Sequence, residues 1–467
     1  MKIYEAAELL RKNKISPPEL AKEVLGKIAE KEKDVKAYIT ICDDILEKAR
    51  EAERNKNDSL LWGIPVAVKD NICTKGLRTT AASRMLEEFV PPYDATVVKR
   101  LKEEGAIIIG KTNMDEFGMG SDSKQSAFQM TVNPVNYAYV PGGSSGGSGA
   151  AVKSGMALGA LGTDTGGSVR QPASFCGVYA LKPTWSLVSR FGLIAFSSSL
   201  DCIGPMANSV KDLAIMTDAI AGWDKKDATS SKREKEEYYK NLTPSVKGLR
   251  IGVPKPFLVE ADESIRKAVI KAAEKLKEMG AEVSECEIPS AKYAVSAYYI
   301  ISSSEASGNL ARYDGVKYGY RAKEYDDYTD MCIKSRSEAF GSEVKRRIIL
   351  GTYALSRGGE LYRRAVGARE LIKRDFEKLF EKYDVILTPT SPCVVPKVNA
   401  VSEIEKKYEK DVCTASVSLA GLPAVNVPFG KDENGMPIGL QLVGNHFTEQ
   451  MLLNAALSFE EGGCGDV

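Results

Sequence analysis

Two glycine- and serine-rich turns within residues 141–176 hold the side chains best suited to chemistry in this chain. The first turn reads Pro-Gly-Gly-Ser-Ser-Gly-Gly-Ser-Gly, and the second reads Thr-Asp-Thr-Gly-Gly-Ser-Val-Arg. Each turn leads into a segment compatible with a helix, and small apolar residues typical of a strand separate the two. Glycines let the backbone present several N–H groups to one point, and a helix that begins there favours negative charge. The pattern therefore predicts a pocket that stabilises an anion.

Three interpretations of these turns are open. A phosphate-binding loop is one, but residues 141–176 lack the Gly-x-x-x-x-Gly-Lys-Ser/Thr arrangement that cradles phosphates. A flexible linker is another, but the flanking segments are apolar and Arg170-Gln171-Pro172 follows the second turn. A nucleophile turn with an oxyanion hole is the third, and it explains why a serine follows two glycines where a helix begins. We favour the third interpretation, which makes the chain a serine-dependent acyl hydrolase.

A serine nucleophile needs a proton acceptor, and the chain contains one histidine, His446. Zinc hydrolases need two or three histidine ligands, so a zinc mechanism is disfavoured. A Ser-His-Asp triad would have to use His446, which we interpret as a loop or surface residue. Lysine can serve as the base if burial keeps it neutral. Lys69 is the candidate because it ends the apolar run Ile-Pro-Val-Ala-Val, although a lysine at a strand end more often stays solvated. Residue types alone leave its role open.

The overall charge of the chain limits what it can bind. The 467 residues include 64 Lys and Arg against 63 Asp and Glu, a net charge of +1. This balance gives the chain no electrostatic basis for binding a polyanion by itself. Charge appears too early for a signal peptide, and no apolar run approaches the ~18 residues of a membrane span. The nine cysteines form no Cys-x-x-Cys pair. We expect a soluble cytoplasmic protein with reduced thiols, no metal and no membrane contact.

The segments that must position the two turns alternate between strands and helices. Residues 63–70 have a buried-strand pattern that ends in charge, residues 94–105 read as a helix capped by Asp94, and residues 106–110 read as a strand. Later segments repeat the alternation, with strands expected at 249–253, 282–288, 385–388, 423–428 and 438–443 and helices at 263–279 and 449–460. Strands that alternate with helices predict an α/β architecture.

We expect a single domain over residues 1–467, since no internal repeat and no domain-sized linker is visible. Residues 1–60 should form an N-terminal helical segment, and residues 61–215 the catalytic core with both turns. Residues 291–383 are expected to be a mostly helical insertion that breaks at Gly358-Gly359.

The two turns together resemble the signature of the amidase-signature family. Residues 142–149 and 164–172 carry the resemblance, with the lysine in the Pro-x-x-x-Lys-Asp sequence at 65–70. It implies an amidase-signature fold, a large mixed β-sheet covered by helices on both faces. It also implies a Ser-cisSer-Lys triad.

In that triad Ser168 is the acyl nucleophile, Ser144, which lies 24 residues earlier, is the relay serine, and Lys69 is the base. Ser145 and Ser148 are the alternatives to Ser144, and the family's spacing favours Ser144. We expect Asp164 to fix the second turn rather than to enter the chemistry. Backbone N–H groups at three positions are expected to form the oxyanion hole, namely Thr165, Gly166 and Gly167.

Within the family, the chain is similar along nearly its whole length to the glutaminase subunits of glutamyl-tRNA(Gln) amidotransferases. The similarity includes Asn-Met-Asp-Glu-Phe at 113–117 and Leu-Ala-Gly-Leu-Pro at 419–423. It implies glutamine as substrate, whose α-carboxylate and α-ammonium need an arginine and a carboxylate. The resemblance assigns these to Arg347, with Arg346 as the alternative, and to Asp411, with Tyr299 as a wall of the pocket.

The resemblance also implies a heterotrimer that converts Glu-tRNA(Gln) to Gln-tRNA(Gln). The B subunit of such a complex binds tRNA and uses ATP and Mg²⁺, and a small C subunit wraps the glutaminase chain. This chain is then expected to need no cofactor of its own and to contact tRNA mainly through its partners. Whether Asp-tRNA(Asn) is also amidated stays open. The alternatives are a stand-alone amidase acting on small amides and a catalytically silent scaffold subunit.

Overall fold

One mixed β-sheet forms the centre of the molecule. The structure is a computed structural model that describes residues 1–259, 261–400 and 411–463. Over this part of the chain, eleven strands follow the order β1-β3-β2-β4-β6-β5-β10-β11-β9-β7-β8. The strands are β1 (Tyr38–Ile41), β2 (Pro65–Lys69), β3 (Ile107–Thr112), β4 (Gly159–Asp164), β5 (Tyr179–Lys182), β6 (Cys202–Ala207), β7 (Arg250–Pro254), β8 (Glu282–Cys286), β9 (Val385–Pro389), β10 (Ala424–Lys431) and β11 (Pro437–Gly444). The predicted α/β fold with a large mixed sheet is confirmed.

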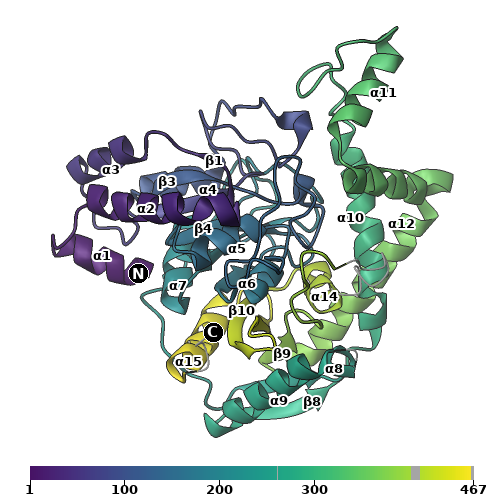
Figure 1. Cartoon of the computed structure of the whole chain (residues 1–467). Helices are drawn as coiled ribbons and strands as arrows, with labels where there is room; N and C mark the ends of the chain where they lie inside the picture. The colour runs from purple at the N-terminus through teal and green to yellow at the C-terminus, as the bar shows by residue number, and fades with distance from the viewer. Residues whose placement is uncertain (260, 401–410, 464–467) are drawn as a thin grey trace.

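Helices connect these strands and surround the sheet (Figure 1). The first half of the chain forms α1 (Ile3–Arg11), α2 (Pro17–Val35), α3 (Ile45–Arg54), α4 (Thr96–Glu103), α5 (Gly146–Lys153), α6 (Arg170–Cys176) and α7 (Val210–Ile220). The second half forms α8 (Pro256–Val259), α9 (Glu263–Glu278), α10 (Ala294–Leu310), α11 (Tyr328–Ala339), α12 (Ser342–Lys382), α14 (Val412–Ala420) and α15 (Glu449–Glu461). Short 3-10 helices are η1 (Arg84–Leu86), η2 (Glu116–Gly118) and η3 (Pro289–Tyr293).

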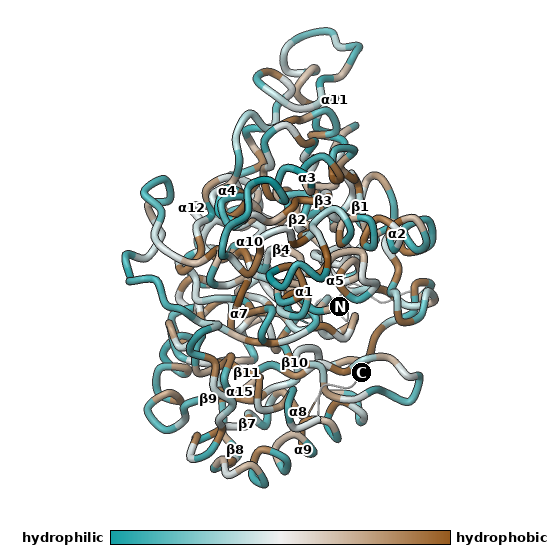
Figure 2. Tube along the Cα trace, turned by 90° about the vertical axis from the view of Figure 1, so that its left-hand side faces the viewer, coloured by the Kyte–Doolittle hydropathy of each residue, from teal (hydrophilic) through white to brown (hydrophobic). Residues whose placement is uncertain are grey.

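Side chains that alternate along the strands bury both faces of the sheet. On β9, Val385 and Leu387 pack with α7, α9 and α15, whereas Ile386 between them packs with α10, α12 and α14. On β11, Leu442 and Val443 divide between the same two cores. Because successive side chains of a strand point to opposite faces, helices cover the sheet on both sides. Figure 2 agrees, since its outer loops are coloured mostly as hydrophilic and the brown stretches lie mainly inside.

Parallel pairing places the end of β2 beside the end of β4. β2 lies between β3 and β4 and runs parallel to both, with Val68 opposite Leu161 of β4 and Lys69 opposite Thr112 of β3. Parallel neighbours end at the same edge of a sheet, so Lys69 and the turn that follows Asp164 come to one place.

Helices α10 and α12 carry two of the residues expected to bind glutamine, Tyr299 and Arg347, whereas Asp411 is the N-cap residue of α14. Gly358 and Gly359 interrupt α12 with φ values of +73° and +71°, a backbone conformation that favours glycine. The two limbs of α12 run in different directions, and α11 projects at one end of the molecule (Figure 1). The predicted break is confirmed.

Two features of the region around β3 differ from what the sequence suggests. Asp94 does not cap α4, because Ala95 is the N-cap residue and Asp94 accepts hydrogen bonds from Lys75 N and Lys102 Nζ. Residues 105–112 also match the phosphate-loop pattern Gly-x-x-x-x-Gly-Lys-Thr, which the two glycine- and serine-rich turns lack. They form no phosphate loop, since Ile107–Thr112 is the strand β3 and the side chain of Lys111 is buried against Thr74 and Thr79.

No helix in the described ranges is long and apolar enough to cross a membrane.

Candidate active site

The structure brings Lys69 and Ser144 into direct contact. Lys69 is fully buried, and its Nζ lies 2.8 Å from Ser144 Oγ, 2.8 Å from Ser145 Oγ and 2.9 Å from Thr163 Oγ1. The peptide bond between Gly143 and Ser144 is cis. Ser148 points elsewhere, since its hydroxyl pairs with Thr112 Oγ1. Both Ser144 and Ser145 therefore touch the lysine, and contact alone does not separate them.

Burial is the main influence on the charge of Lys69. Desolvation lowers the pKa of the amine to about 7, although the carboxylates of Asp115, Asp164 and Asp201 act in the opposite direction. A lysine with this pKa is largely neutral at slightly alkaline pH and can accept a proton.

Ser168 lies where the second turn meets the first. Its carbonyl oxygen accepts a 3.1 Å hydrogen bond from Ser145 N, which joins the two turns. The residue is 8% exposed and lines a small pocket with glycines of both turns. Ser168 therefore combines shelter from bulk water with access to a ligand.

A buried ion pair holds the second turn in shape. Asp164 and Arg170 are both fully buried, with Arg170 Nη2 2.9 Å from Asp164 Oδ1 and Nε 3.0 Å from Oδ2. Asp164 also accepts hydrogen bonds from the backbone N–H groups of Gly167 and Val169. Burial by itself would raise the pKa of Asp164, but Arg170 holds it at about 2. Asp164 thus organises the turn around Ser168 and has no contact with Lys69 or Ser144 among the hydrogen bonds of the described residues.

The N–H groups of the second turn do not all face the pocket. Gly167 N donates to Asp164 Oδ1 at 2.8 Å, so this group bonds within the turn and differs from the oxyanion donor that the sequence suggested. The N–H groups of Gly166 and Ser168 donate none of the hydrogen bonds found within the described part of the chain, and both residues line the pocket. Thr165 is not among the lining residues, and its hydroxyl donates to Asp201. The N–H of Ser168 was not among the donors expected from the sequence.

The three residues expected around glutamine line the same pocket as Ser168. Tyr299 donates its hydroxyl to Asp411 Oδ2 at 2.6 Å, and the Arg347 guanidinium lies 4.5 Å from the centre of the Tyr299 ring. Arg347 is 4% exposed, whereas the side chain of Arg346 is 45% exposed and does not line the pocket. The geometry therefore favours Arg347 over Arg346.

Several residues that line the pocket were not anticipated, among them Tyr298 and Gln171. The ring of Tyr298 packs so closely on Gly166 that a Cβ there would lie 2.4 Å from it. Gln171 accepts a hydrogen bond from Gly143 N at 3.0 Å. The space open to water between the pocket residues is about 10 Å³, room for about one water molecule.

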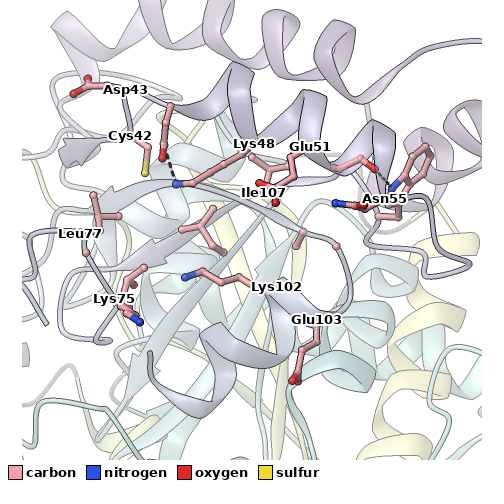
Figure 3. Close-up of a pocket in the computed structure, with 18 of the residues that line it drawn as sticks. Cys42, Asp43, Lys48, Glu51, Asn55, Lys75, Leu77, Lys102, Glu103 and Ile107 are labelled. Carbon is pink, nitrogen blue, oxygen red and sulfur yellow. Dashed lines mark hydrogen bonds and ion pairs between the residues drawn. The ribbon is translucent and has the colours of Figure 1, made fainter. Parts of the chain in front are cut away.

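Other reactive groups lie outside this arrangement. His446 is exposed, and its Nε2 lies 3.1 Å from the carbonyl oxygen of Ala420, as expected for a loop histidine. Burial raises the pKa of the Cys176 thiol to about 12, which keeps it unreactive. A roomier groove of about 930 Å³ lies between α3, β3 and α4 (Figure 3), and no residue of the two turns lines it.

Comparison with known proteins decides the family. The sequence model of the amidase family, described as "Amidase", matches residues 19–453. This chain belongs to the amidase family. The A subunit of the glutamyl-tRNA(Gln) amidotransferase of Thermoanaerobacter pseudethanolicus is 51% identical, over 98% of this chain and 96% of that protein.

Solved amidase structures share the fold as well. The crystal structure of the A subunit of glutamyl-tRNA(Gln) amidotransferase from Thermotoga maritima is 39% identical, with a TM-score of 0.83 over 99% of this chain and 94% of that one. The native peptide amidase of Stenotrophomonas maltophilia is 29% identical, with a TM-score of 0.85 over 99% and 96%. This amidase therefore resembles both an amidotransferase chain and a peptide amidase in fold, and its half-identical relatives are amidotransferase A subunits.

Proposed function

We propose that this amidase is the glutaminase subunit of a glutamine-dependent tRNA amidotransferase, and that it releases ammonia from glutamine. The observation that carries the proposal is the contact of a fully buried Lys69 with Ser144, whose neighbour Ser145 donates its N–H to the carbonyl oxygen of Ser168. The names of the half-identical relatives support the choice of substrate and of complex.

Acylation begins with the neutral form of Lys69. Its two N–H bonds can be donated to Ser145 and Thr163, which leaves the nitrogen lone pair for the proton of Ser144. Ser144 then takes the proton of Ser168, whose Oγ attacks the carboxamide carbon of glutamine. The N–H groups of Gly166 and Ser168 stabilise the resulting oxyanion.

Collapse of the tetrahedral intermediate breaks the carbon–nitrogen bond. Ser144 returns a proton to the departing nitrogen, so ammonia leaves and a γ-glutamyl ester stays on Ser168. Water then attacks the ester carbonyl and gives its proton to Ser144, which releases glutamate and restores the Ser168 hydroxyl.

The pocket supplies one charged group for each charge of the amino acid. Arg347 would bind the α-carboxylate of glutamine and Asp411 the α-ammonium, while Tyr299 orients Asp411 through its hydroxyl. A simple amide has neither charge, so these residues select glutamine over other amides.

The proposal includes partners, since the relatives are named as components of an amidotransferase. The B and C subunits of that enzyme would complete a cytoplasmic heterotrimer, and the ATP and Mg²⁺ of the amidation are used by the complex. The net charge of +1 supports tRNA contact mainly through those partners.

A glutaminase assay tests the proposal. Ammonia release from glutamine and from a simple primary amide should be compared for the chain alone and for the chain with the B and C subunits. We expect glutamine to be the better substrate in the complex. A simple amide that outperforms glutamine with and without the partners would instead indicate a stand-alone amidase, and no turnover of either would indicate a silent scaffold.

A further inference from the structure

Glu116 is a buried carboxylate that the proposed mechanism does not use. It lies in η2, just after β3, and is 2% exposed. Its neighbour in the sequence, Phe117, packs with Phe340 and Val344 in one apolar cluster. A carboxylate at such a site needs hydrogen-bond partners, because burying it unpaired is costly.

Its partners lie on two separate parts of the chain. The hydroxyl of Ser83, next to η1, donates to Glu116 Oε1, and Gly341 N donates to Oε2 at 2.8 Å. Gly341 is the N-cap residue of α12 and has no side chain to cap the helix. Helix N-termini carry N–H groups without intrahelical acceptors, and a carboxylate there is favourable. Glu116 thus caps α12 from a distant segment.

The fit at this cap is tight. A Cβ on residue 341 would lie 2.4 Å from Glu116 Oε2, so a larger residue there would push the carboxylate away from the helix. The contact therefore fixes the distance between η2 and the start of α12.

The first turns of α12 carry the arginine of the glutamine pocket. Arg347 donates its Nε to Glu343 at 2.8 Å, which ties it to the first turn of the same helix. The position of Gly341 thus sets the position of Arg347, because the intervening residues form regular helix.

Asp115, the residue before Glu116, contacts the turn that contains Ser144. Asp115 N donates to Ser144 O at 3.2 Å, and a Cβ on Gly143 would lie 2.2 Å from Asp115 Oδ2. Two consecutive residues, Asp115 and Glu116, therefore contact the relay turn and the helix that carries Arg347.

We propose that Glu116 is a positioning residue that sets Arg347 relative to the Ser144 turn, so that a bound glutamine presents its carboxamide to Ser168. This inference rests on the proposed function, since it assumes that Arg347 binds glutamine. Loss of the cap should weaken glutamine binding and spare the relay.

Kinetics of Glu116 variants in the assembled complex test this role. Glu116→Ala should raise the KM for glutamine on the order of tenfold, the upper end of the loss expected for one hydrogen bond. It should change the turnover of a simple primary amide by less than about twofold. Glu116→Gln keeps an acceptor for Gly341 N and should restore KM to nearly the wild-type value. Glu116→Asp keeps the charge but falls short of Gly341, so it should resemble Glu116→Ala and serves if the alanine variant fails to fold.

Ser83→Ala and a set of double variants separate positioning from general stability. Ser83→Ala removes the other partner of Glu116 and leaves the α12 cap in place, so it should have a smaller effect on KM. In an Arg347→Met background, Glu116→Gln, Glu116→Asp and Glu116→Ala should cause no further increase in KM. Additive effects in that background, or equal losses with both substrates, would overturn the positioning role while leaving the glutaminase proposal intact. A wild-type complex that does not turn over glutamine would overturn both.

Discussion

Lys69 Nζ lies 2.8 Å from Ser144 Oγ inside the protein, at the edge where β2 and β4 end together. Desolvation lowers the pKa of this lysine to about 7, against an ordinary value of 10.5. At a solvated lysine, the same distance would mean that a charged ammonium group donates a hydrogen bond to the serine. Because the pKa of Lys69 is about 7, its neutral amine can instead accept the proton of the Ser144 hydroxyl.

The pH dependence of activity should report the ionisation of Lys69. The base works only when neutral, so kcat/KM for glutamine should fall about tenfold per pH unit below an apparent pKa of about 7. Burial also raises the pKa of Asp201 to about 6, so Asp201→Asn is the control; it should keep the acid limb but move it to lower pH, because the Asp201 carboxylate no longer raises the pKa of Lys69. Lys69→Arg should be nearly as inactive as Lys69→Ala, because a guanidinium cannot act as a base. Substantial activity in the arginine variant would show that Lys69 only holds the turn.

Variants of the two neighbouring serines distinguish the relay from its surroundings. Ser144→Ala should lower kcat by about 10²–10⁴, the usual range for loss of a proton-transfer group. Ser145→Ala should have a much smaller effect, because Ser145 Oγ bonds to the backbone of Thr163 as well as to Lys69. Steady-state rates of ammonia release measure both. If Ser145→Ala lowered kcat more than Ser144→Ala, Ser145 rather than Ser144 would be the relay serine.

Changes at Arg347 or Asp411 should affect glutamine selectively. Each charged hydrogen bond contributes about 1.5–3 kcal/mol, so Arg347→Met and Asp411→Asn should raise the KM for glutamine roughly ten- to over a hundredfold. Turnover of a simple amide should hardly change. Arg346→Met is the matched control, because the side chain of Arg346 is 45% exposed and lies outside the pocket. If Arg346→Met raised the KM for glutamine more than Arg347→Met, then Arg346 rather than Arg347 would bind the α-carboxylate.

Asp164→Asn should destabilise the protein. It leaves the buried Arg170 without its counter-charge, a change that costs about 3–5 kcal/mol in comparable pairs. The pKa of Asp164 in the folded protein is about 2, below its ordinary value of 3.8, so this contribution is present above about pH 4 and is lost as the pH falls toward 2. Chemical denaturation measures the change, with Asp384→Asn in the exposed Arg250–Asp384 pair as a control that should change stability far less. Equal effects at the two sites would contradict the role of the buried pair.

Local patterns predicted a nucleophile turn with an anion-stabilising pocket, whereas the roles of Ser168, Ser144 and Lys69 and the residues around glutamine were predicted from the resemblance to the amidase-signature family. The two glycine turns and the apolar run before Lys69 are continuous in the sequence, and parallel pairing of β2 and β4 brings them together. Strand β6 and helix α14 were not anticipated, because every residue of β6 is buried and α14 consists of small, mostly apolar residues, so neither shows clear periodicity.

Contacts between distant segments could not be predicted in this way. The orientation of Gly167 N depends on the carboxylate of Asp164, and Arg170 reaches Gln441 far along the chain. The cap of α12 joins Glu116 to Gly341, residues 225 positions apart. Asp94 was expected to cap α4 from its residue type, but its side chain instead bonds to Lys75 and Lys102.

Trapping the acyl-enzyme tests the central claim most directly. The complex should be mixed with glutamine, quenched in acid during the first turnovers and digested for peptide mass spectrometry. We predict a γ-glutamyl ester on the peptide that contains Ser168, absent from Ser168→Ala and from Lys69→Arg. An adduct on Cys176, or ammonia release by Ser168→Ala at the wild-type rate, would contradict the serine relay.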